Sequence, residues 1–429
     1  MLHCSCLLTH LNRKNALSTW SWIIFDTASA GYTTIMITAY YILYFKNVIV
    51  QDVHRGDFLW GKMIGISMFL LAIVTPALGA IADQGYLRKK LFLFFSLMCV
   101  VFTAALTFVG ASQATLCVLF FSLSLIGYEA CITFYETFLN SVSTKETVGK
   151  ISGYSFAFGY MGGIMSILIS YPFIARMAEG EWSLAPLWIV VIQFLVFGFP
   201  VFLFLRDEPS PEVERKSVSQ SVRDGFTSLG HTLADLKRFP DLAKFLVAYL
   251  FFYDGIATVI SFGGTFAKDT LGFSTKEVFI VFIVSNIIAV PGSFLGGYLT
   301  DKIGGRKTVL ITLLIWIATL LALAASDSKA MFYVVTCMVG LGLGSTQGAA
   351  RALYAQFVPK HSEARFFALK GLCGRAGTIL GPMMFGTISY LTSNQRLASL
   401  SLIFFFVVGF IMVYVVNEQD GKQKALEAA

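Results

Sequence analysis

The chain has 429 residues, of which 56% are hydrophobic and only 13% are charged, and its formal net charge is +7. A soluble domain carries about 25% charged residues, so this composition excludes a soluble globular protein and indicates an integral membrane protein. We expect it to contact membrane lipid and no nucleic acid.

The apolar runs are long and continuous, without the alternation of a barrel strand. A helix needs about 20 apolar residues to cross ~30 Å of hydrocarbon, and lipid admits only helices or closed barrels. We therefore predict an all-α membrane protein with twelve transmembrane helices. In chain order, the expected spans are 18–45, 58–83, 89–111, 113–139, 150–175, 184–205, 241–267, 275–300, 307–326, 329–357, 365–392 and 395–417.

The longest polar interruption follows the sixth span. We expect a six-helix bundle over 1–205, a cytoplasmic linker over 206–240 and a second six-helix bundle over 241–429. Apolar residues between Val218 and Phe239 recur at steps of three and four, the spacing of one helix face. They predict an amphipathic helix along the membrane surface or the cytoplasmic ends of the bundle; a solvated connector with an apolar face is the alternative.

Most of the 32 Lys and Arg residues fall in the loops on the side of the two termini. Cytoplasmic loops retain these residues, so we expect both termini in the cytoplasm. No short apolar region with a small-residue cleavage site precedes the first span, and we expect no cleaved signal peptide.

The residues that carry enzyme or metal chemistry do not form a recognisable pattern. Five of the seven Cys lie within apolar runs, without a disulfide framework or a metal spacing. No Gly-rich phosphate-binding loop with Lys-Ser/Thr is present, which argues against transport driven by ATP. We expect no metal, no cofactor and no enzymatic activity.

Two loops repeat one pattern, with GAIADQGYLRKK after the second span and GYLTDKIGGRK after the eighth. Each has a Gly four residues before an Asp, then a further Gly and a basic pair, and the two aspartates are 218 residues apart. Matching residues near the ends of the fourth and tenth spans and in the fifth and eleventh spans agree with this offset. The two halves therefore duplicate one unit.

The loop residues predict a gate. Gly permits close approach of the chain, and the Asp can bind a nearby helix N-terminus and the basic cluster, so that charges paired in one conformation separate in the other. The predicted conformational gating residues are Gly79, Asp83, Arg88, Gly297, Asp301 and Arg306.

The duplicated unit with this loop signature resembles the major facilitator superfamily, whose two halves rock about a central site near the membrane midplane. The stretches FDTASAGY, FYETFLN, FFYDGIATVI and QGAARALYAQFVPKHSEARFFALKGLCGRAGTILGPMMFG resemble its vacuole-effluxer-like branch, whose fungal members export amino acids from vacuoles. The first span departs from the branch at Thr27 and Ser29-Ala30, where Trp and Asn-Ser are common, so the specificity would differ if that Asn contacts substrate.

The resemblance implies that the first, fourth, seventh and tenth spans line the central cavity, and each of them carries polar or charged residues. The eleventh span adds a base that the resemblance also implies. The candidate substrate-binding or coupling residues are Asp26, Glu129, Tyr135, Asp254, Gln347, Arg351 and Arg375.

Structural alternatives remain for several candidates. Asp26 can serve as a cap or in an interhelical salt bridge, and Arg351 can extend to the inner interface. Arg375 can pair with Asp254 or Glu129 instead of a substrate anion. Glu136 is expected in an interfacial salt bridge, and Lys370 is expected to be solvated.

No His lies in a span, so a coupled proton would need a carboxylate, whose pKa rises on burial. We predict a monomeric secondary transporter that moves a small metabolite, an amino acid or similar zwitterion, by alternating access, with proton-coupled efflux as one form. The membrane would be the cell (inner) membrane of a bacterium or the vacuolar membrane of a fungus. The alternatives are a proton-linked exporter of amphipathic compounds or lipids, and a non-transporting receptor on a transporter scaffold.

Overall fold

The computed structural model describes residues 13–51, 53–83, 87–110, 113–177, 180–206, 235–360, 362–376, 378, 380–392 and 394–428. The chain divides into two compact units, Met1–Val142 with Phe158–Leu229, and Ser143–Ala157 with Gly230–Ala429. One helix, α8 (Val148–Met177), begins in the second unit and ends in the first. The domain boundaries expected from the sequence stay a prediction.

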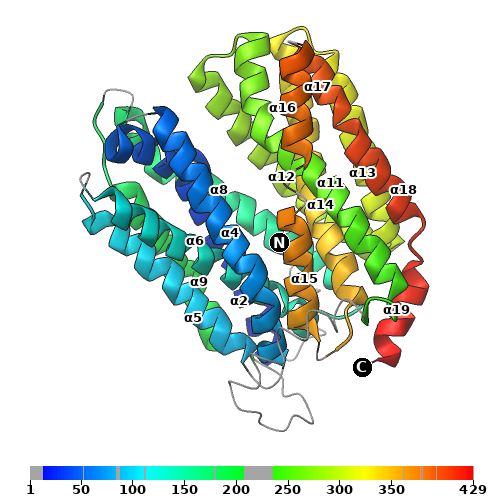
Figure 1. Ribbon diagram of the computed structural model, residues 1–429. Coiled ribbons are helices and arrows are strands. Elements are labelled where there is room, and N and C mark those ends of the chain that lie inside the picture. The colour runs from blue at the N-terminus through cyan, green and yellow to red at the C-terminus, as the bar shows by residue number, and fades with distance from the viewer. Residues whose placement is uncertain are drawn as a thin grey trace. The chain divides into compact units, whose positions relative to one another are not determined.

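The first unit consists of helices (Figure 1). They are α2 (Arg13–Tyr32), the π-helix η1 (Thr33–Ala39), α3 (Tyr41–Tyr44), the π-helix η2 (Phe45–Val50), α4 (Val53–Asp83), α5 (Arg88–Ala105), the 3₁₀ helix η3 (Leu106–Phe108), α6 (Ala114–Glu136), α7 (Leu139–Val142), most of α8 and α9 (Ala185–Phe204). Within this unit, α5 packs against α6, α2 against α9 and α4 against α6.

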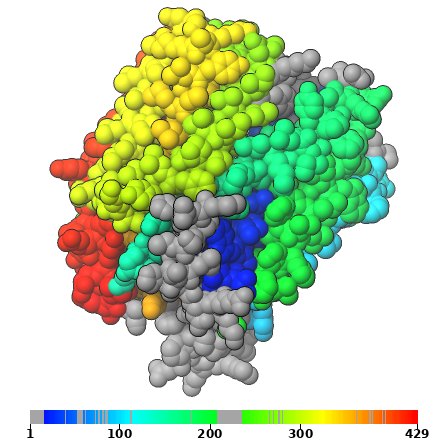
Figure 2. Space-filling model, turned by 180° about the vertical axis from the view of Figure 1, so that it is seen from behind, coloured from blue at the N-terminus to red at the C-terminus, as the bar shows by residue number. Residues whose placement is uncertain are grey.

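The second unit is also helical. After the start of α8 it has α11 (Pro240–Thr265), the π-helix η4 (Phe266–Thr270), α12 (Thr275–Ile303), α13 (Gly305–Ala324), α14 (Lys329–Phe357), α15 (Glu363–Ala376), α16 (Leu380–Thr392), α17 (Gln395–Ser401), α18 (Ile403–Tyr414) and α19 (Glu418–Glu427). Here α12 packs against α14, and α11 and α13 both pack against α18. Figure 2 shows the yellow part of the chain, which includes α13, and the red C-terminal part, which includes α18 and α19.

The helix ends follow local rules. Pro240 begins α11, where its missing N–H costs no hydrogen bond. Ser274 and Glu277 form a reciprocal capping box at the start of α12. Gly304, with φ of +95°, separates α12 from α13, and this left-handed region favours glycine.

Ten helices among the described residues are long and apolar enough to cross a membrane. The two further expected spans correspond to α4, which holds a shorter apolar stretch at Lys62–Thr75, and to α15 followed by α16. The predicted all-α fold class is therefore confirmed. The amphipathic helix expected in the linker lies largely outside the described residues, which resume at Asp235.

The first and eleventh spans are not continuous α-helices, and the twelfth is divided into α17 and α18. The first span changes to π-helix at η1, where Tyr40 donates its backbone N–H to the carbonyl oxygen of Ile35 at 3.1 Å. The sequence TTIMITA is rich in β-branched residues, whose side chains crowd the preceding turn. In the eleventh span Thr378 lies in a turn, after α15, which ends at Ala376, and before α16, which begins at Leu380.

Candidate functional site

Asp254 is a fully buried carboxylate on α11, with 0% exposure. Its Oδ2 accepts a hydrogen bond from the backbone N–H of Gly381 at 2.8 Å. Its Oδ1 is buried as well and accepts no hydrogen bond from the described part of the chain. The carboxylate thus has one satisfied and one unsatisfied oxygen.

The interruption of the eleventh span creates the partner of Asp254. Gly381 is the second residue of α16, so its N–H is one of the donors that a helix start leaves without an internal acceptor. The helix dipole adds positive potential at this position. A Cβ on Gly381 would lie 2.7 Å from Oδ1 of Asp254, so glycine is what permits the close approach.

Asp26 lies where α2 crosses α8 in the first unit. Its Cβ is 3.5 Å from the position that a Cβ on Gly159 would occupy, and the side chain is 8% exposed. The neighbouring Thr27 donates its hydroxyl to the carbonyl of Phe158 at 3.0 Å. Asp26 is therefore placed in a contact between the first and fifth spans, and its coupling role stays a prediction.

Tyr135 joins α6, the fourth span, to α2, the first span. Trp22 Nε1 donates to the carbonyl of Tyr135 at 3.0 Å, and the Tyr135 hydroxyl donates to the carbonyl of Trp22 at 2.9 Å. Their rings stack with centroids 4.6 Å apart. The hydroxyl and the carbonyl of Tyr135 thus both hold α6 against α2. Glu129 and Glu136, on the same helix α6, are half-buried.

Arg351 on α14 is buried, with 2% exposure, and does not extend to solvent. Its Nε donates to Ser152 Oγ at 3.0 Å and its Nη2 to the Ser152 carbonyl at 2.9 Å. The guanidinium also lies 4.0 Å from the ring centroid of Phe156. Arg351 therefore holds the first turns of α8 within the second unit. Gln347, one turn earlier on α14, is half-buried.

Two bases in α15 remain to be placed. Lys370 was expected to be solvated, and this is wrong: it is 5% exposed, and its Nζ lies 5.4 Å from the ring centroid of Tyr249 and 5.7 Å from that of Phe367. Packing of α15 on α11 encloses it. Arg375 lies one residue before the end of α15, and its side chain is outside the described part of the structure.

The second repeated loop makes the expected contact with a helix N-terminus. Asp301 Oδ1 accepts from the backbone N–H of Gly149 at 2.7 Å, and Oδ2 accepts from that of Lys150 at 2.9 Å. Both donors belong to the first turn of α8. Gly297 approaches so closely that a Cβ there would lie 2.6 Å from the Gly149 carbonyl oxygen. The gating role of this contact stays a prediction.

A basic residue of each loop binds the end of the last membrane span of its own half. Arg306 donates through Nε to the Val413 carbonyl at 3.3 Å and through Nη2 to the Tyr414 carbonyl, at the end of α18. Lys89 Nζ donates to the Leu205 carbonyl at 2.5 Å, at the end of α9. Cations stabilise the negative end of a helix dipole. Sequence reasoning missed Lys89, although the repeat aligns it with Lys307, next to Arg306.

Less is described of the first loop. Gly79 is buried near the end of α4, and the side chain of Asp83 lies outside the described part. Arg88 is buried, with its guanidinium 5.5 Å from the ring centroid of Phe138. Within the described residues, no group of three or more His, Cys, Asp or Glu is placed to hold a metal ion.

Known solved structures share this fold. A structure of the Escherichia coli fucose:proton symporter FucP superposes with a TM-score of 0.71 at 14% identity, covering 94% of this chain and 98% of its own. The proton:xylose symporter XylE superposes with a TM-score of 0.70 at 16% identity, covering 97% and 98%. At these identities the likeness shows the fold alone, and that fold is the one predicted for the major facilitator superfamily.

Sequence relatives identify the branch. A Bacillus subtilis (strain 168) protein named "Uncharacterized MFS-type transporter YxiO" is 27% identical over 410 residues, covering 93% of this chain and 94% of the relative. "Autophagy-related protein 22" of Yarrowia lipolytica is 25% identical over 307 residues, which is 64% of this chain and only 51% of the fungal protein. The chain thus matches about half the length of that fungal relative.

The family model described as "Vacuole effluxer Atg22 like" matches residues 62–426. Together with the fold, this makes the protein a multi-pass membrane transporter and not an enzyme. The chain belongs to the Atg22-like vacuole effluxer family of major facilitator superfamily secondary transporters.

Proposed function

We propose that this transporter moves an amino acid or similar zwitterion by alternating access, and that Asp254 carries the coupled proton. The observation that supports this most is the unsatisfied Oδ1 of a carboxylate with no solvent exposure. Burial disfavours the charged form of a carboxylate, and an opposite charge nearby favours it. A proton and the ammonium group of a zwitterion therefore compete for the same oxygen.

The neighbouring helix start tunes this competition. When Asp254 is ionised, the N–H of Gly381 and the positive end of α16 stabilise it through Oδ2. That leaves Oδ1 as the position where a substrate cation or a proton binds. Binding of a proton or a substrate cation changes the charge beside the break between α15 and α16. These two helices together form the discontinuous eleventh span.

Alternating access requires contacts that form in one conformation and break in another. We assign this role to the start of α8, where Asp301 binds the first N–H groups and Arg351 binds Ser152 one turn later. Since α8 continues from the second unit into the first, these contacts are suited to a gate. We propose that the protein is a monomer with both termini in the cytoplasm, in the cell membrane of a bacterium or the vacuolar membrane of a fungus.

Transport in proteoliposomes tests the proposal. Purified protein would be reconstituted, a pH gradient imposed, and uptake of a panel of radiolabelled amino acids measured together with proton flux. We expect Asp254→Asn to abolish accumulation driven by the pH gradient and to retain exchange of labelled for unlabelled substrate, since Asn keeps an acceptor for the Gly381 N–H but cannot titrate. Asp327→Asn is the matched control, because its carboxylate is exposed.

Three results would reject the proposal. Accumulation by Asp254→Asn at the wild-type level would place proton coupling at another residue. Flux of hydrophobic cations or lipids with no amino-acid flux would favour the alternative exporter, and binding of metabolites without any flux would favour a receptor.

A further inference from the structure

The final described helix, α19, is stabilised by a cap and ion pairs of its own, and it packs against the second unit. Asn417 caps its start by accepting from the backbone N–H groups of Gln419 and Asp420, each at 3.2 Å. Ion pairs between residues four apart, Glu418 with Lys422 at 2.6 Å and Asp420 with Lys424 at 2.8 Å, follow its length. Figure 1 shows α19 in red below α18.

One face of α19 is buried against the rest of the second unit. Gly421 and Ala425, one turn apart, are the buried positions. A Cβ on Gly421 would lie 2.7 Å from the ring of Phe357, at the end of α14, so glycine allows the helix to approach this ring. The helix is therefore packed against the second unit through a small-residue face.

Glu418 supplies the cap that α13 lacks. The residue before α13 is Gly304, which has no side chain to accept a hydrogen bond from the first turn. Glu418 Oε1 accepts from the Gly305 N–H at 3.1 Å, and Oε2 accepts from the Arg306 N–H at 3.0 Å. A carboxylate at this position satisfies two orphan donors and complements the helix dipole.

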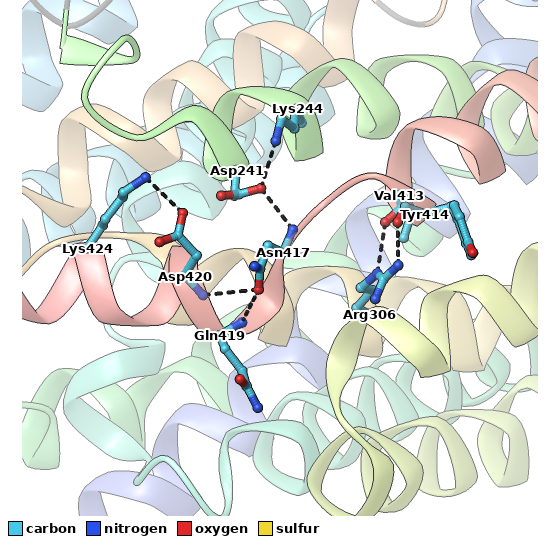
Figure 3. Close-up of polar contacts among 9 residues, drawn as sticks. All are labelled: Asp241, Lys244, Arg306, Val413, Tyr414, Asn417, Gln419, Asp420 and Lys424. Atoms are coloured by element: carbon cyan, nitrogen blue, oxygen red, sulfur yellow. Dashed lines mark hydrogen bonds and ion pairs between the residues drawn. The ribbon is translucent and has the colours of Figure 1, made fainter.

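Hydrogen bonds hold the turn between α18 and α19 to two other parts of the second unit, as Figure 3 shows. Asp241, in the first turn of α11, is 2% exposed and accepts from the Asn417 N–H at 2.8 Å and from Lys244 Nζ at 3.1 Å. On the other side, Arg306 donates to the carbonyls of Val413 and Tyr414. The docked α19 is thus connected to α11 and to the turn between α12 and α13.

That same turn carries the contact with α8. Asp301 binds the first N–H groups of α8, and only Lys302 and Ile303 separate it from Gly304, which leads into the two N–H groups held by Glu418. Helix α12 ends between these two positions, at Ile303. Asp301 and the start of α13 are therefore joined by only the last residues of α12 and the non-helical Gly304.

We propose that α19 is a regulatory brace, in which docked Glu418 holds the turn between α12 and α13 so that Asp301 stays bound to the start of α8, and undocking of α19 releases the turn and speeds transport. The effect on transport rate rests on the proposed function. The docking and its link to α8 do not depend on it.

Hydrogen exchange measured by mass spectrometry on the full chain in nanodiscs tests the brace. In Glu418→Ala, we expect the amides of Gly305 and Arg306 to exchange about fivefold faster, the change that losing a helix cap predicts. We also expect faster exchange at Gly149 and Lys150, the amides that Asp301 binds. The matched control is Glu427→Ala, on the same helix near its far end, which should leave all four amides unchanged. Glu418→Gln replaces the alanine variant if that protein does not fold; its side chain has one acceptor oxygen in place of two, so we expect faster exchange at one of the amides of Gly305 and Arg306.

Unchanged exchange at Gly305 and Arg306 would overturn the cap. Faster exchange there with no change at Gly149 and Lys150 would overturn the link to α8. An equal effect of Glu427→Ala would overturn the specific role of Glu418.

Transport assays on the same proteins test regulation. Glu418→Ala and a chain lacking 418–429 should both show a higher turnover than the wild type, and an equal or lower turnover would overturn the regulatory role. If the wild type moves no substrate at all, the proposed transport function fails, whereas the exchange measurements still decide whether Glu418 braces the turn.

Discussion

At the scale of single residues, three carboxylates accept hydrogen bonds from the backbone N–H groups of helix starts. Asp254 binds α16, Asp301 binds α8 and Glu418 binds α13. A helix start offers several orphan N–H groups together with a positive dipole, so it stabilises an acidic group without adding a mobile charge. The two contributions can therefore be separated by substitution. Asn or Gln removes the negative charge and keeps much of the hydrogen bonding.

Glu277 gives a prediction for pH dependence. It accepts two hydrogen bonds from Lys329, at 2.8 and 2.9 Å, and caps α12 with Ser274. The hydrogen bond from Lys329, followed by those from Ser274, lowers the pKa of Glu277 from 4.5 to about 2. Since the folded-state pKa lies below the ordinary value, the stabilisation is complete above pH 4.5 and is lost as the pH falls toward 2.

The measurement is the melting temperature of the wild type and Glu277→Gln between pH 3 and pH 8. We expect the wild type to be more stable by a constant margin above pH 5, and the margin to shrink below pH 4.5. A margin that grows on acidification would contradict the assignment of Lys329 as the main cause of the lowered pKa.

At the scale of elements, glycines set how closely the helices of the second unit approach. A Cβ on Gly153 of α8 would meet the carbonyl oxygen of Ser293 and would lie 2.9 Å from the Cα of Gly297, both on α12. Helices in membranes associate largely by such close packing, because lipid removes the hydrophobic driving force between them. The contacts of Asp301 and Arg351 with α8 depend on this approach.

Gly153→Ala should therefore destabilise the protein by about 1–3 kcal/mol, the usual cost of overpacking. The measurement is thermal unfolding of the detergent-solubilised protein. Gly65→Ala is the control, since Gly65 lies in α4 with no heavy atom within 4 Å of the added Cβ, and its unfolding temperature should not fall. A neutral Gly153→Ala would show that α8 and α12 can separate at little cost.

At the scale of the whole molecule, the two halves share a contact as well as a loop sequence: in each, a basic side chain binds the C-terminal end of a helix. A basic residue of each repeated loop binds the carbonyl end of the sixth helix in its own half, Lys89 at Leu205 and Arg306 at Tyr414. The two contacts share no partner and lie in different units. The repeat therefore predicts two independent contacts of the same kind.

Lys89→Ala and Arg306→Ala should each lower stability by about 0.3–1 kcal/mol, the contribution of a cation at a helix C-terminus. The double variant should lose the sum of the two, because sites without shared partners contribute additively. Chemical or thermal unfolding of the three variants measures this. A double variant that is much less stable than the sum would show that the two loops stabilise one another.

The all-α class, the expected spans and the duplicated loops can be predicted from the sequence, because hydrophobic length and internal repetition are properties of the linear chain. It also predicted that a loop Asp binds a helix start, which holds at Asp301. The fold and the family follow from these local signals.

Which polar residues contact one another depends on how the helices pack. Asp254 and Gly381 are 127 residues apart, and Arg351 and Ser152 are 199 apart, so no local periodicity relates them. The enclosure of Lys370 and the interruption before α16 likewise depend on how α11 packs against α15 and α16. A polar group in lipid must find its partner inside the protein, and only the packing of the helices determines which partner is within reach.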